Sequence, residues 1–406
     1  MRVLLLTQFY WPEAADYKNR ALACELVKQG HEPIVLTTFP NHPKGKVFDG
    51  YKQSLVLKEL KDGFPVIRVP IYPDHSQSGI KRALNYLSFT LSSSLLGFLQ
   101  IGKVDVVLVH ATPITLSFTA GLFKLFYGAP IILDVLDLWP DAIISNGYHP
   151  ESAYAKFANS VATVSYQIAN KINVPSEGFK ERLISRGVSQ DKINLVPIWG
   201  DSTLFYKTTA CKKFADRFNL RDKFCIIYAG NIGQMQGLET VIDAAEMLTD
   251  MEDMRFVLVG AGNASEELRH RAAQKNLNNI VFTGAYPKED MAGILAWADA
   301  LLVSLKDDDY MAINFPSKIP GYLGCGKPIL VSANGEAASI VKHNEVGLHC
   351  LPENPQAFAQ MIRDFRSMPY EERRRMGLRA EETFNNLYNK DKVIKRYIEI
   401  LSDITE

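Results

Sequence analysis

The most distinctive chemistry in this chain lies in the segment AINFPSKIPGYLGCGKPILVS. Pro316 suits the first turn of a helix, so the segment predicts a helix that begins near Phe315. The backbone N–H groups of the next residues, Ser317, Lys318 and Ile319, then have no partner within the helix. Lys318 adds a positive charge at this end, where a cation is unfavourable unless an anion is bound. The pattern favours a phosphate-binding site over a solvated lysine.

Glycine-rich turns follow three apolar runs in the second half of the chain. They read YAGNIG around Gly230 and Asn231, GAG from Gly260, and a single glycine at Gly284. Such turns let backbone N–H groups approach a phosphate at the start of a helix. One such turn is explained equally well as a tight chain reversal. Three at the carboxyl ends of successive predicted strands favour a ligand, because open α/β sheets bind ligands at that edge.

Other kinds of site are disfavoured by spacing. The first apolar run leads into FYWPEAAD, without the G-x-G-x-x-G turn that a nicotinamide dinucleotide site needs. The chain has no G-x-S-x-G elbow and no H-E-x-x-H metal motif. Residues 307–309 have the D-x-D spacing of some metal sites, but an aspartate triplet after a strand is more often a solvated loop. We therefore expect no metal and no cofactor other than a co-substrate.

Short apolar runs alternate with helical patterns from one end of the chain to the other. Runs that are apolar throughout suit parallel strands covered on both faces. This rhythm predicts an α/β fold of two doubly wound, Rossmann-like parallel sheets in tandem. The predicted strands are residues 2–8, 33–38, 66–69, 104–110, 130–135 and 160–164, then 225–229, 255–259, 279–283, 300–304 and 328–332.

Turn signals place the boundary between the two sheets near residues 194–205, in NLVPIWGDSTLF. We expect a first domain over residues 1–200 and a second over 201–385. A long helical pattern covers residues 380–402 and has no strand after it. We expect the final helix, residues 386–406, to pack back on the first domain.

The composition is that of an ordinary globular protein. Of 406 residues, 47% are hydrophobic and 22% are charged, with 45 basic and 45 acidic side chains. This balance argues against a nucleic-acid binder held by bulk charge. Five scattered cysteines without a C-x-x-C pair indicate free thiols in a reducing compartment. The first apolar run is too short for a signal peptide, so we expect a cytoplasmic protein.

Residues 83–102 form an uncharged stretch as long as a membrane span. Several of its residues are polar, and the large apolar ones share one helical face, which predicts an amphipathic helix rather than a span. Lys81 and Arg82 precede it, in a half of the chain that has a small excess of basic residues. Two interpretations remain open: docking on an anionic membrane, or packing inside the first domain. The apolar residues of this face are Leu84, Leu87, Leu91, Leu95 and Phe98.

Several strings of this chain resemble a known family. YAGNIGQMQGLETVIDAA, VLVGAGNASEEL, VFTGAYPKEDMAGILAWADALLVSL and GKPILVS are similar to the second domain of GT-B glycosyltransferases of the family-4 type. FYWPE, VKQGHEPIVLTTFPNHPKGK, IKRALNYLSF, LDLWPD and VPIWGD are similar to the first domain. The combination resembles the bacterial surface-polysaccharide subgroup that contains the L-fucosamine transferase WbuB and colanic-acid transferases. The likeness spans essentially the whole chain.

The resemblance implies an enzyme that moves a sugar from a nucleotide diphosphate donor to a lipid-linked or saccharide acceptor. It implies that the second domain holds the nucleotide sugar, that the first holds the acceptor, and that the chemistry lies in a cleft between them. It further implies retention of anomeric configuration without a metal. The donor expected is a UDP-linked N-acetylated or 6-deoxy sugar, used in O-antigen or capsule synthesis. Peripheral contact with the inner face of the cytoplasmic membrane is expected, and binding of nucleic acid is not.

Asp137 is the polar residue best suited to position a sugar or an acceptor hydroxyl, although a helix N-cap is an equally good interpretation. A leaving diphosphate needs positive charge and aimed N–H donors. Lys318 and its neighbours could supply them, together with Arg20 from the first domain. The expected substrate-binding residues are Glu13, Arg20, Gly230, Asn231, Gln236, Gly260, Gly284, Tyr286, Lys306, Ser317, Lys318 and Ile319, with no metal ligand.

The sequence also departs from the family pattern. Many members carry two glutamates around the phosphate-binding helix, where this chain has Ile313 and Gly321. The roles of those glutamates, placing the donor sugar and holding the ribose, are therefore not carried over. The usual basic pair of the glycine-rich turn appears as Asn231 and Gln236, and the usual glycine pair of the first loop is replaced at residues 14–16.

Two other functions remain open at this point. A sugar-nucleotide epimerase shares the double-sheet architecture, but it needs acid and base residues, and the LDLWPD and PSKIPGYL strings fit transferases better. A catalytically silent binding subunit is consistent with the two absent glutamates.

Overall fold

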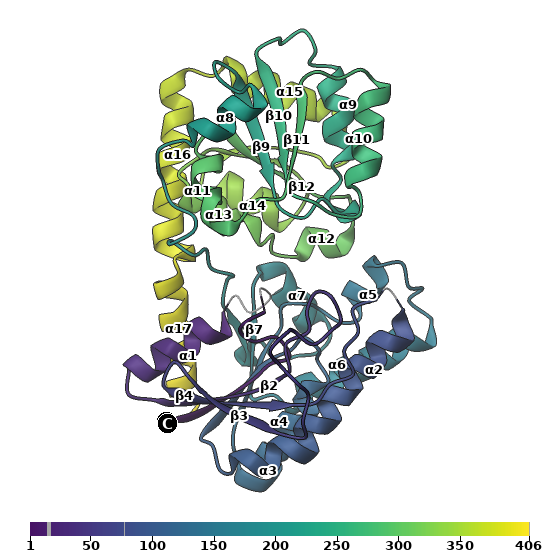
Figure 1. Cartoon of the computed structure of the whole chain (residues 1–406), viewed down its shortest axis with the longest axis vertical. Helices are drawn as coiled ribbons and strands as arrows, with labels where there is room; N and C mark the ends of the chain where they lie inside the picture. Colours follow the sequence, from purple (N-terminus) through teal and green to yellow (C-terminus); the bar gives the residue numbers. More distant parts are fainter. Residues whose placement is uncertain (14–17, 77, 406) are drawn as a thin grey trace. The chain divides into compact units, whose positions relative to one another are not determined.

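The computed structural model describes residues 1–13, 18–76 and 78–405 (Figure 1). The chain forms two compact units, and each unit is built on its own sheet. The first unit consists of Met1–Pro175, Phe179–Val196 and Ile394–Glu406, and the second of Ser176–Gly178 and Pro197–Val393. The predicted fold class, two α/β units with parallel sheets, is confirmed.

The first unit contains an eight-stranded sheet in the order β3-β4-β2-β1-β5-β6-β7-β8. All neighbouring strands are parallel except β3 and β4, which form an antiparallel pair at one edge. The central strands β1, β5 and β6 consist almost wholly of buried apolar residues, as expected for parallel strands covered on both faces. The strands are β1 (Arg2–Leu6), β2 (Glu32–Thr38), β3 (Leu57–Lys61), β4 (Phe64–Val69), β5 (Val106–His110), β6 (Ile131–Asp134), β7 (Lys171–Val174) and β8 (Ile193–Leu195).

Helices connect these strands and pack on the sheet (Figure 1). They are α1 (Asn19–Lys28), α2 (Gly79–Ser92), the π-helical turn η1 (Ser93–Gly97), α3 (Phe98–Ile101), α4 (Leu116–Tyr127), α5 (Asp141–Ser145), α6 (Ala153–Ile168), α7 (Glu177–Ser185) and η2 (Gln190–Lys192). Arg68 on β4 is the largest side chain fully buried in the described chain. Its guanidinium donates to Glu59, to the carbonyl of Thr38 and to the carbonyl of Trp11, so its charge is paired and its donors are used.

The second unit contains a six-stranded, wholly parallel sheet in the order β11-β10-β9-β12-β13-β14. The chain moves outward from β9 to β11 and then returns to the other side of β9, which is the Rossmann order with its switch point between β9 and β12. The strands are β9 (Phe224–Ala229), β10 (Met254–Val259), β11 (Ile280–Gly284), β12 (Ala300–Ser304), β13 (Ile329–Ser332) and β14 (Gly347–Cys350).

Buried apolar side chains form a core on each face of this sheet. The helical segments of this unit are α8 (Lys212–Phe218), η3 (Gln234–Gln236), α9 (Glu239–Glu246), α10 (Ser265–Gln274), η4 (Lys288–Asp290), α11 (Met291–Leu295), α12 (Asp309–Ile313), α13 (Lys318–Gly324), α14 (Glu336–His343), α15 (Pro355–Ser367), α16 (Tyr370–Thr383) and the π-helical turn η5 (Phe384–Tyr388). The last helix, α17 (Lys390–Asp403), begins in this unit and continues into the first.

One predicted strand is wrong. Residues 160–164 lie inside helix α6, and the strand of this region is β7, ten residues later. A short apolar run rich in β-branched residues cannot be told from a buried helical turn by periodicity alone. Ser152 decides the outcome locally, because its side chain accepts a hydrogen bond from the N–H of Ala155 and caps α6. Strands β3 and β14 were also absent from the sequence prediction, because both are short and carry exposed polar residues.

The helical pattern over residues 380–402 is not one uninterrupted helix. Helix α16 ends at Thr383, the π-helical turn η5 follows, and Asn389 is extended before α17 begins. The Asn389 side chain accepts a hydrogen bond from the N–H of Asp391, which stabilises the new helix start. From Ile394 onward the chain belongs to the first unit.

The apolar face of residues 83–102 is exposed rather than packed inside the first unit. Leu84, Leu87, Leu91 and Leu95 are between 43% and 65% exposed. The π-helical turn η1 adds a residue to one turn of the helix, so the exposed row continues at Leu99 instead of Phe98. Phe98 turns inward and packs on Phe123 and Tyr127 of α4. In the described parts of the chain, no helix is long and apolar enough to cross a bilayer.

Tyr397 connects α17 to the first sheet through a buried hydrogen bond. Its hydroxyl donates to Asp134 at the end of β6 over 2.7 Å, and both side chains are buried. We expect Tyr397→Phe to lower the free energy of unfolding by about 1.5–3 kcal/mol, because a buried charged acceptor loses one of its donors while Lys18 stays paired with it. Tyr370→Phe, at a 69% exposed position, is the control and should stay within about 0.5 kcal/mol. Urea denaturation followed by tryptophan fluorescence measures the free energy of unfolding of both variants. Equal losses of stability in the two variants would contradict a stabilising role of the Tyr397 hydroxyl.

Candidate active site

In the second unit, the backbone after β9 and the backbone after β10 approach each other closely at Gly230 and Gly260. We call this contact the glycine crossing. Gly230 and Gly260 have φ values of +143° and +144°, which side chains rarely permit. A Cβ atom on Gly260 would lie 1.9 Å from the carbonyl oxygen of Gly230, so only glycine fits there. A Cβ atom on Gly230 would lie 2.7 Å from Cε of Lys318. Because Gly230 has no side chain, the Lys318 side chain can lie directly against its backbone.

Lys318 is the first residue of α13, and its ammonium group has neutral partners. Its Nζ donates to Oε1 of Gln236 over 2.5 Å and lies 4.9 Å from the centre of the Tyr228 ring. The Tyr228 hydroxyl lies 3.0 Å from the same Gln236 oxygen. No described carboxylate pairs with Lys318, and burial lowers the pKa of its ammonium group to about 8. An uncompensated, partly buried cation is a binding position for an anion.

The segment around Lys318 differs from the sequence prediction in one respect. Helix α13 begins at Lys318 and not near Phe315, and the N–H of Ile319 donates to the carbonyl of Pro316 over 3.0 Å. That N–H is therefore engaged within the chain. Ser317 precedes the helix and is exposed, and its side chain makes no cap hydrogen bond.

The other predicted residues of the second unit lie around the same sheet edge with different surroundings. Asn231 is exposed at the glycine crossing. Gly284 ends β11, and its carbonyl accepts the N–H of Gly260 over 2.9 Å. The ring of Tyr286 packs edge-on against Phe214, which turns it toward α8. Lys306 follows β12 and donates its backbone N–H to Met235.

Gly321 shows why a glutamate does not fit at its position. A Cβ atom there would lie 3.0–3.2 Å from ring atoms of Phe205, and Gly321 is itself buried. The space that a longer side chain would need is occupied by an aromatic ring. The position at which many family members carry a glutamate is therefore filled here by the Phe205 ring.

The aspartate triplet does not converge on a metal site. Asp308 caps α12 by accepting the N–H groups of Tyr310 and Met311, both at 2.9 Å. Asp307 accepts a hydrogen bond from the side chain of Asn334. Within the described residues, no three His, Cys, Asp or Glu side chains are grouped so that they could hold an ion.

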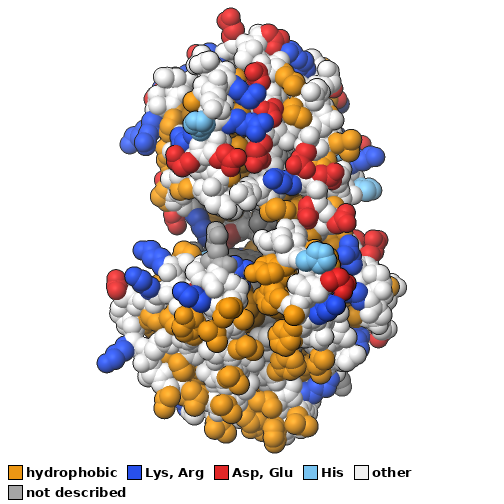
Figure 2. All heavy atoms as spheres, turned by 90° about the vertical axis from the view of Figure 1, so that its right-hand side faces the viewer, with side chains coloured by type: hydrophobic (Ala, Val, Ile, Leu, Met, Phe, Trp, Pro, Cys, Tyr) orange, Lys and Arg blue, Asp and Glu red, His pale blue; other side chains and the backbone are white. Residues whose placement is uncertain are grey.

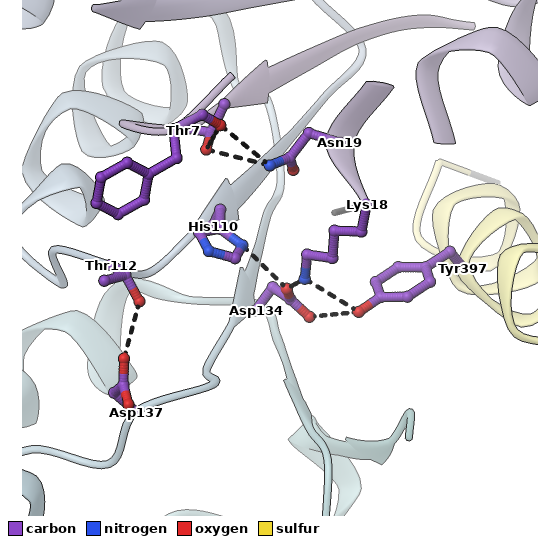
Figure 3. Close-up of polar contacts among 9 residues, drawn as sticks. Thr7, Lys18, Asn19, His110, Thr112, Asp134, Asp137 and Tyr397 are labelled. Carbon is purple, nitrogen blue, oxygen red and sulfur yellow. Dashed lines mark hydrogen bonds and ion pairs between the residues drawn. The ribbon is translucent and has the colours of Figure 1, made fainter. Parts of the chain in front are cut away.

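In the first unit, Asp137 follows β6 in a half-buried loop (Figure 3). The hydroxyl of Thr112 donates to its carboxylate over 3.3 Å. Helix α5 begins at Asp141 with Pro140 in the cap position, so Asp137 does not cap that helix. A carboxylate can accept several hydrogen bonds, so a ligand hydroxyl can add to the contacts that Asp137 makes.

A buried polar cluster lies beside Asp137 at the same sheet edge. Figure 3 shows Lys18, His110 and Tyr397 pointing toward Asp134. Lys18 forms an ion pair with Asp134 and lies 3.3 Å from the Tyr397 hydroxyl. His110 Nδ1 is 3.7 Å from Asp134, and burial, reinforced by the Lys18 charge, holds the pKa of this imidazole well below its usual value. The cluster consists of a paired charge and a neutral histidine.

Two further predicted residues are committed to contacts within the first unit. Glu13 is buried and accepts the N–H groups of Tyr10, Asn41 and His42, and burial raises its pKa against the effect of these donors. Arg20 forms a two-pronged, exposed ion pair with Asp62. Residues 14–16, where the family glycine pair is replaced, lie outside the described residues.

Sequence reasoning did not single out Lys18, Asp134 or Tyr397 as a cluster. The sequence does contain a signal for Asp134. This carboxylate is the last residue of the apolar run IILD, so it lies at the carboxyl end of a predicted parallel strand, where α/β sheets bind ligands. Tyr397 carried none, since 263 residues separate it from Asp134.

Comparisons with known proteins agree with these two units. Residues 18–199 match the model of the glycosyl transferase 4-like domain, and residues 212–383 match that of glycosyl transferases group 1. The chain is 26% identical over 391 residues to the putative colanic acid biosynthesis glycosyl transferase WcaI of Escherichia coli K12, covering 92% of each chain. It is 24% identical over 272 residues to the probable glycosyltransferase WbjE of Pseudomonas aeruginosa, covering 64% of this chain and 65% of the relative.

Solved structures show the same fold. Anabaena Alr3699/HepE in complex with UDP superposes with a TM-score of 0.74 at 17% identity, covering 99% of this chain and 100% of that one. WaaG, a glycosyltransferase involved in lipopolysaccharide biosynthesis, superposes with a TM-score of 0.69 at 12% identity, covering 99% of each chain. With its two sheets and its two matched domains, the chain is a glycosyltransferase of the GT-B fold, made of a glycosyl transferase 4-like domain and a group 1 glycosyl transferase domain.

Proposed function

We propose that this enzyme transfers a sugar from a nucleotide diphosphate donor to a lipid-linked or saccharide acceptor during synthesis of a bacterial surface polysaccharide. The names of its relatives support this class of pathway, since WcaI is named for colanic acid biosynthesis. The donor proposed is a UDP-linked N-acetylated or 6-deoxy sugar, and the HepE neighbour was solved with UDP. The proposal includes retention of anomeric configuration and a location at the inner face of the cytoplasmic membrane.

The observation that carries the donor assignment is the uncompensated charge of Lys318. This cation lies against Gly230 with no described carboxylate as partner. A diphosphate would supply the missing negative charge, and the same cation would stabilise the diphosphate as it leaves the sugar. Because positive charge matters most where negative charge develops, Lys318 would lower the barrier for departure of the nucleotide.

On the acceptor side we assign Asp137 to hold a hydroxyl. Its carboxylate accepts the hydroxyl of Thr112 over 3.3 Å, and a carboxylate can accept several hydrogen bonds. We propose a metal-free reaction, because Asp307 and Asp308 are committed to Asn334 and to the cap of α12. No observation favours the epimerase. A silent binding subunit would bind nucleotide without turnover.

Turnover with a panel of nucleotide sugars tests the function. Purified protein is incubated with UDP-, GDP- and dTDP-linked sugars together with membrane extract as the acceptor source, and released nucleotide and extended product are measured. Nucleotide release with product formation for one donor supports the transferase. Nucleotide binding without release from any donor would establish the silent subunit instead.

Removing the Lys318 charge tests the donor site. We expect Lys318→Ala to weaken UDP binding by about 10–100-fold, the worth of a charge-assisted contact, while uridine affinity changes by less than about twofold. Lys342→Ala removes an exposed lysine of α14 and is the matched control. Isothermal calorimetry with UDP and uridine measures both variants. Equal UDP affinity in Lys318→Ala and the natural protein would show that Lys318 does not bind the diphosphate.

The lowered pKa of Lys318 gives the same measurement a pH dependence. Below pH 8 the ammonium group is charged, and above pH 8 the unliganded protein loses this charge. UDP affinity should therefore fall as the pH rises above about 8. Lys318→Arg should lack this fall, because a guanidinium group stays charged throughout the range.

The glycine crossing gives a second test of the donor edge. Gly260→Ala should lower the Tm of the second unit and weaken UDP binding more than about tenfold, because its Cβ atom has no room beside the Gly230 carbonyl. Gly284→Ala is the control for backbone strain alone, since a Cβ atom there meets nothing within 4 Å. It should cost only about 1–2 kcal/mol of stability. Equal stability losses in the two variants would contradict the crossing as the cause.

We further propose that the first unit docks on the membrane. The row formed by Ile80, Leu84, Leu87, Leu91, Leu95 and Leu99 is exposed along α2, η1 and α3. Helix α4 packs beside α2 and exposes Phe118, Leu125 and Phe126. Figure 2 shows hydrophobic side chains gathered on this unit. Lys81 and Arg82 flank the row and suit anionic headgroups, each with about 1 kcal/mol.

Flotation with anionic vesicles tests this docking. We expect the double variant Leu91→Gln and Leu95→Gln to lower the vesicle-bound fraction at least about tenfold, because each buried leucine contributes about 1.5–3 kcal/mol. High salt should weaken binding of the natural protein without abolishing it. The control is Leu55→Gln with Leu60→Gln, which alters two leucines that are 72% and 75% exposed away from the row. Loss of binding in the control alone, or no binding by the natural protein, would overturn the docking proposal.

A further inference from the structure

A second concave site lies at the carboxyl edge of the first sheet, apart from Asp137. Its volume is about 230 Å³. Phe9 follows β1, His42 follows β2, and the loop Asp74–Ser76 follows β4; helix α2 closes the site with Arg82, Asn85 and Tyr86. We call these eight residues the α2 pocket. It belongs wholly to the first unit.

The α2 pocket is held in shape by buried contacts. Asn85 accepts a hydrogen bond from the side chain of Gln8 and donates to the carbonyl of Tyr72, which fixes α2 against β1 and the loop after β4. The rings of His42 and His75 meet edge to face at 4.8 Å, and Phe9 packs on His42 at 5.1 Å. A preformed wall of this kind needs little ordering when a ligand enters.

The charges that face the pocket balance one another. Arg82 contributes one positive charge, and Asp74, whose carboxylate accepts from Ser76, contributes one negative charge. Burial lowers the pKa of both His42 and His75, so both imidazoles are neutral near pH 7. A phosphate group would find no net positive charge here. The pocket therefore suits a neutral ligand.

The polar atoms of the pocket offer both donors and acceptors. Asn41 donates its amide to the carbonyl of Phe39, so its oxygen accepts from Nε2 of His75, and Nδ1 of neutral His75 is left as an acceptor. Nδ1 of His42 is buried without a hydrogen-bond partner. Arg82 is exposed and forms no ion pair with any described residue. A ligand rich in hydroxyl groups can use Arg82 and Nδ1 of His75, because each hydroxyl donates and accepts.

We propose that the α2 pocket binds a neutral sugar ring, the terminal residue of the acceptor saccharide. This inference rests on the proposed function and names the part of the acceptor that the first unit recognises. Phe9 and Tyr86 would face the apolar C–H surface of the ring, and Arg82, Asp74 and His75 its hydroxyls.

Helix α2 links this pocket to the membrane surface. Arg82, Asn85 and Tyr86 lie on the helix face that lines the pocket, whereas Leu84, Leu87 and Leu91 lie on the exposed row. One helix thus presents a sugar-binding face and a lipid-binding face. A saccharide whose other end is anchored in the bilayer matches this arrangement.

Histidine NMR with free sugars tests the proposal. Protein labelled with ¹⁵N at its 8 histidines is titrated with neutral monosaccharides, both plain and N-acetylated, and separately with inorganic diphosphate. The signals of His42 and His75, assigned with His42→Gln and His75→Gln, should shift with at least one sugar and not with diphosphate. No shift with any sugar up to its solubility limit, or a shift with diphosphate alone, would overturn the proposal.

Variants separate the pocket from the rest of the enzyme. Arg82→Gln should weaken the sugar affinity measured from these shifts about tenfold, because a hydrogen bond from a charged donor contributes about that much. His149→Gln, which removes an exposed imidazole outside the pocket, should leave it unchanged. UDP binding by calorimetry is followed in parallel. Sugar shifts without UDP binding would refute the donor proposal and keep the pocket, whereas UDP binding without sugar shifts would do the reverse.

Discussion

Parallel strand pairing is the constraint on which the rest of this structure depends. Strands that run in one direction bring all their carboxyl ends to one edge of the sheet, so the loops that follow them are gathered there. In the second unit this edge carries Gly230, Gly260 and Lys318. In the first it carries Asp134, Asp137 and the α2 pocket. The chemistry of the protein is concentrated where pairing ends and backbone groups become available.

Two lysines, one buried and one partly buried, have different electrostatic surroundings. Lys18 is paired with Asp134 and contacted by Tyr397, so its charge is neutralised within the first unit and holds α17 in place. Among the described residues, Lys318 contacts the neutral oxygen of Gln236 and the ring of Tyr228 and no carboxylate. A paired charge in the interior contributes to structure, whereas an unpaired one is held at a cost that an anionic ligand removes.

Helix α2 combines two surfaces because its sequence has two periodic patterns. Its leucines recur at helical spacing on the exposed side, and Arg82, Asn85 and Tyr86 recur on the side of the pocket. The π-helical turn η1 then shifts the apolar row by one residue, from Phe98 to Leu99, and leaves Phe98 free to pack on α4. A local change in helical geometry thus keeps both the exposed row and the interior packing continuous.

The sequence by itself determined the fold class, most strands and the segment around Lys318, because apolar runs, glycine turns and proline positions are local signals. It failed at residues 160–164, where a short apolar run fits a strand and a helix equally well, and it placed the start of α13 three residues early. Only the tertiary structure decided that Lys318 has no carboxylate partner in the described part of the chain, that Phe205 occupies the space beside Gly321, and that Tyr397 reaches Asp134. The reason is physical: burial, charge compensation and the shape of a pocket depend on residues far apart in the chain, and no local pattern encodes which of them will meet.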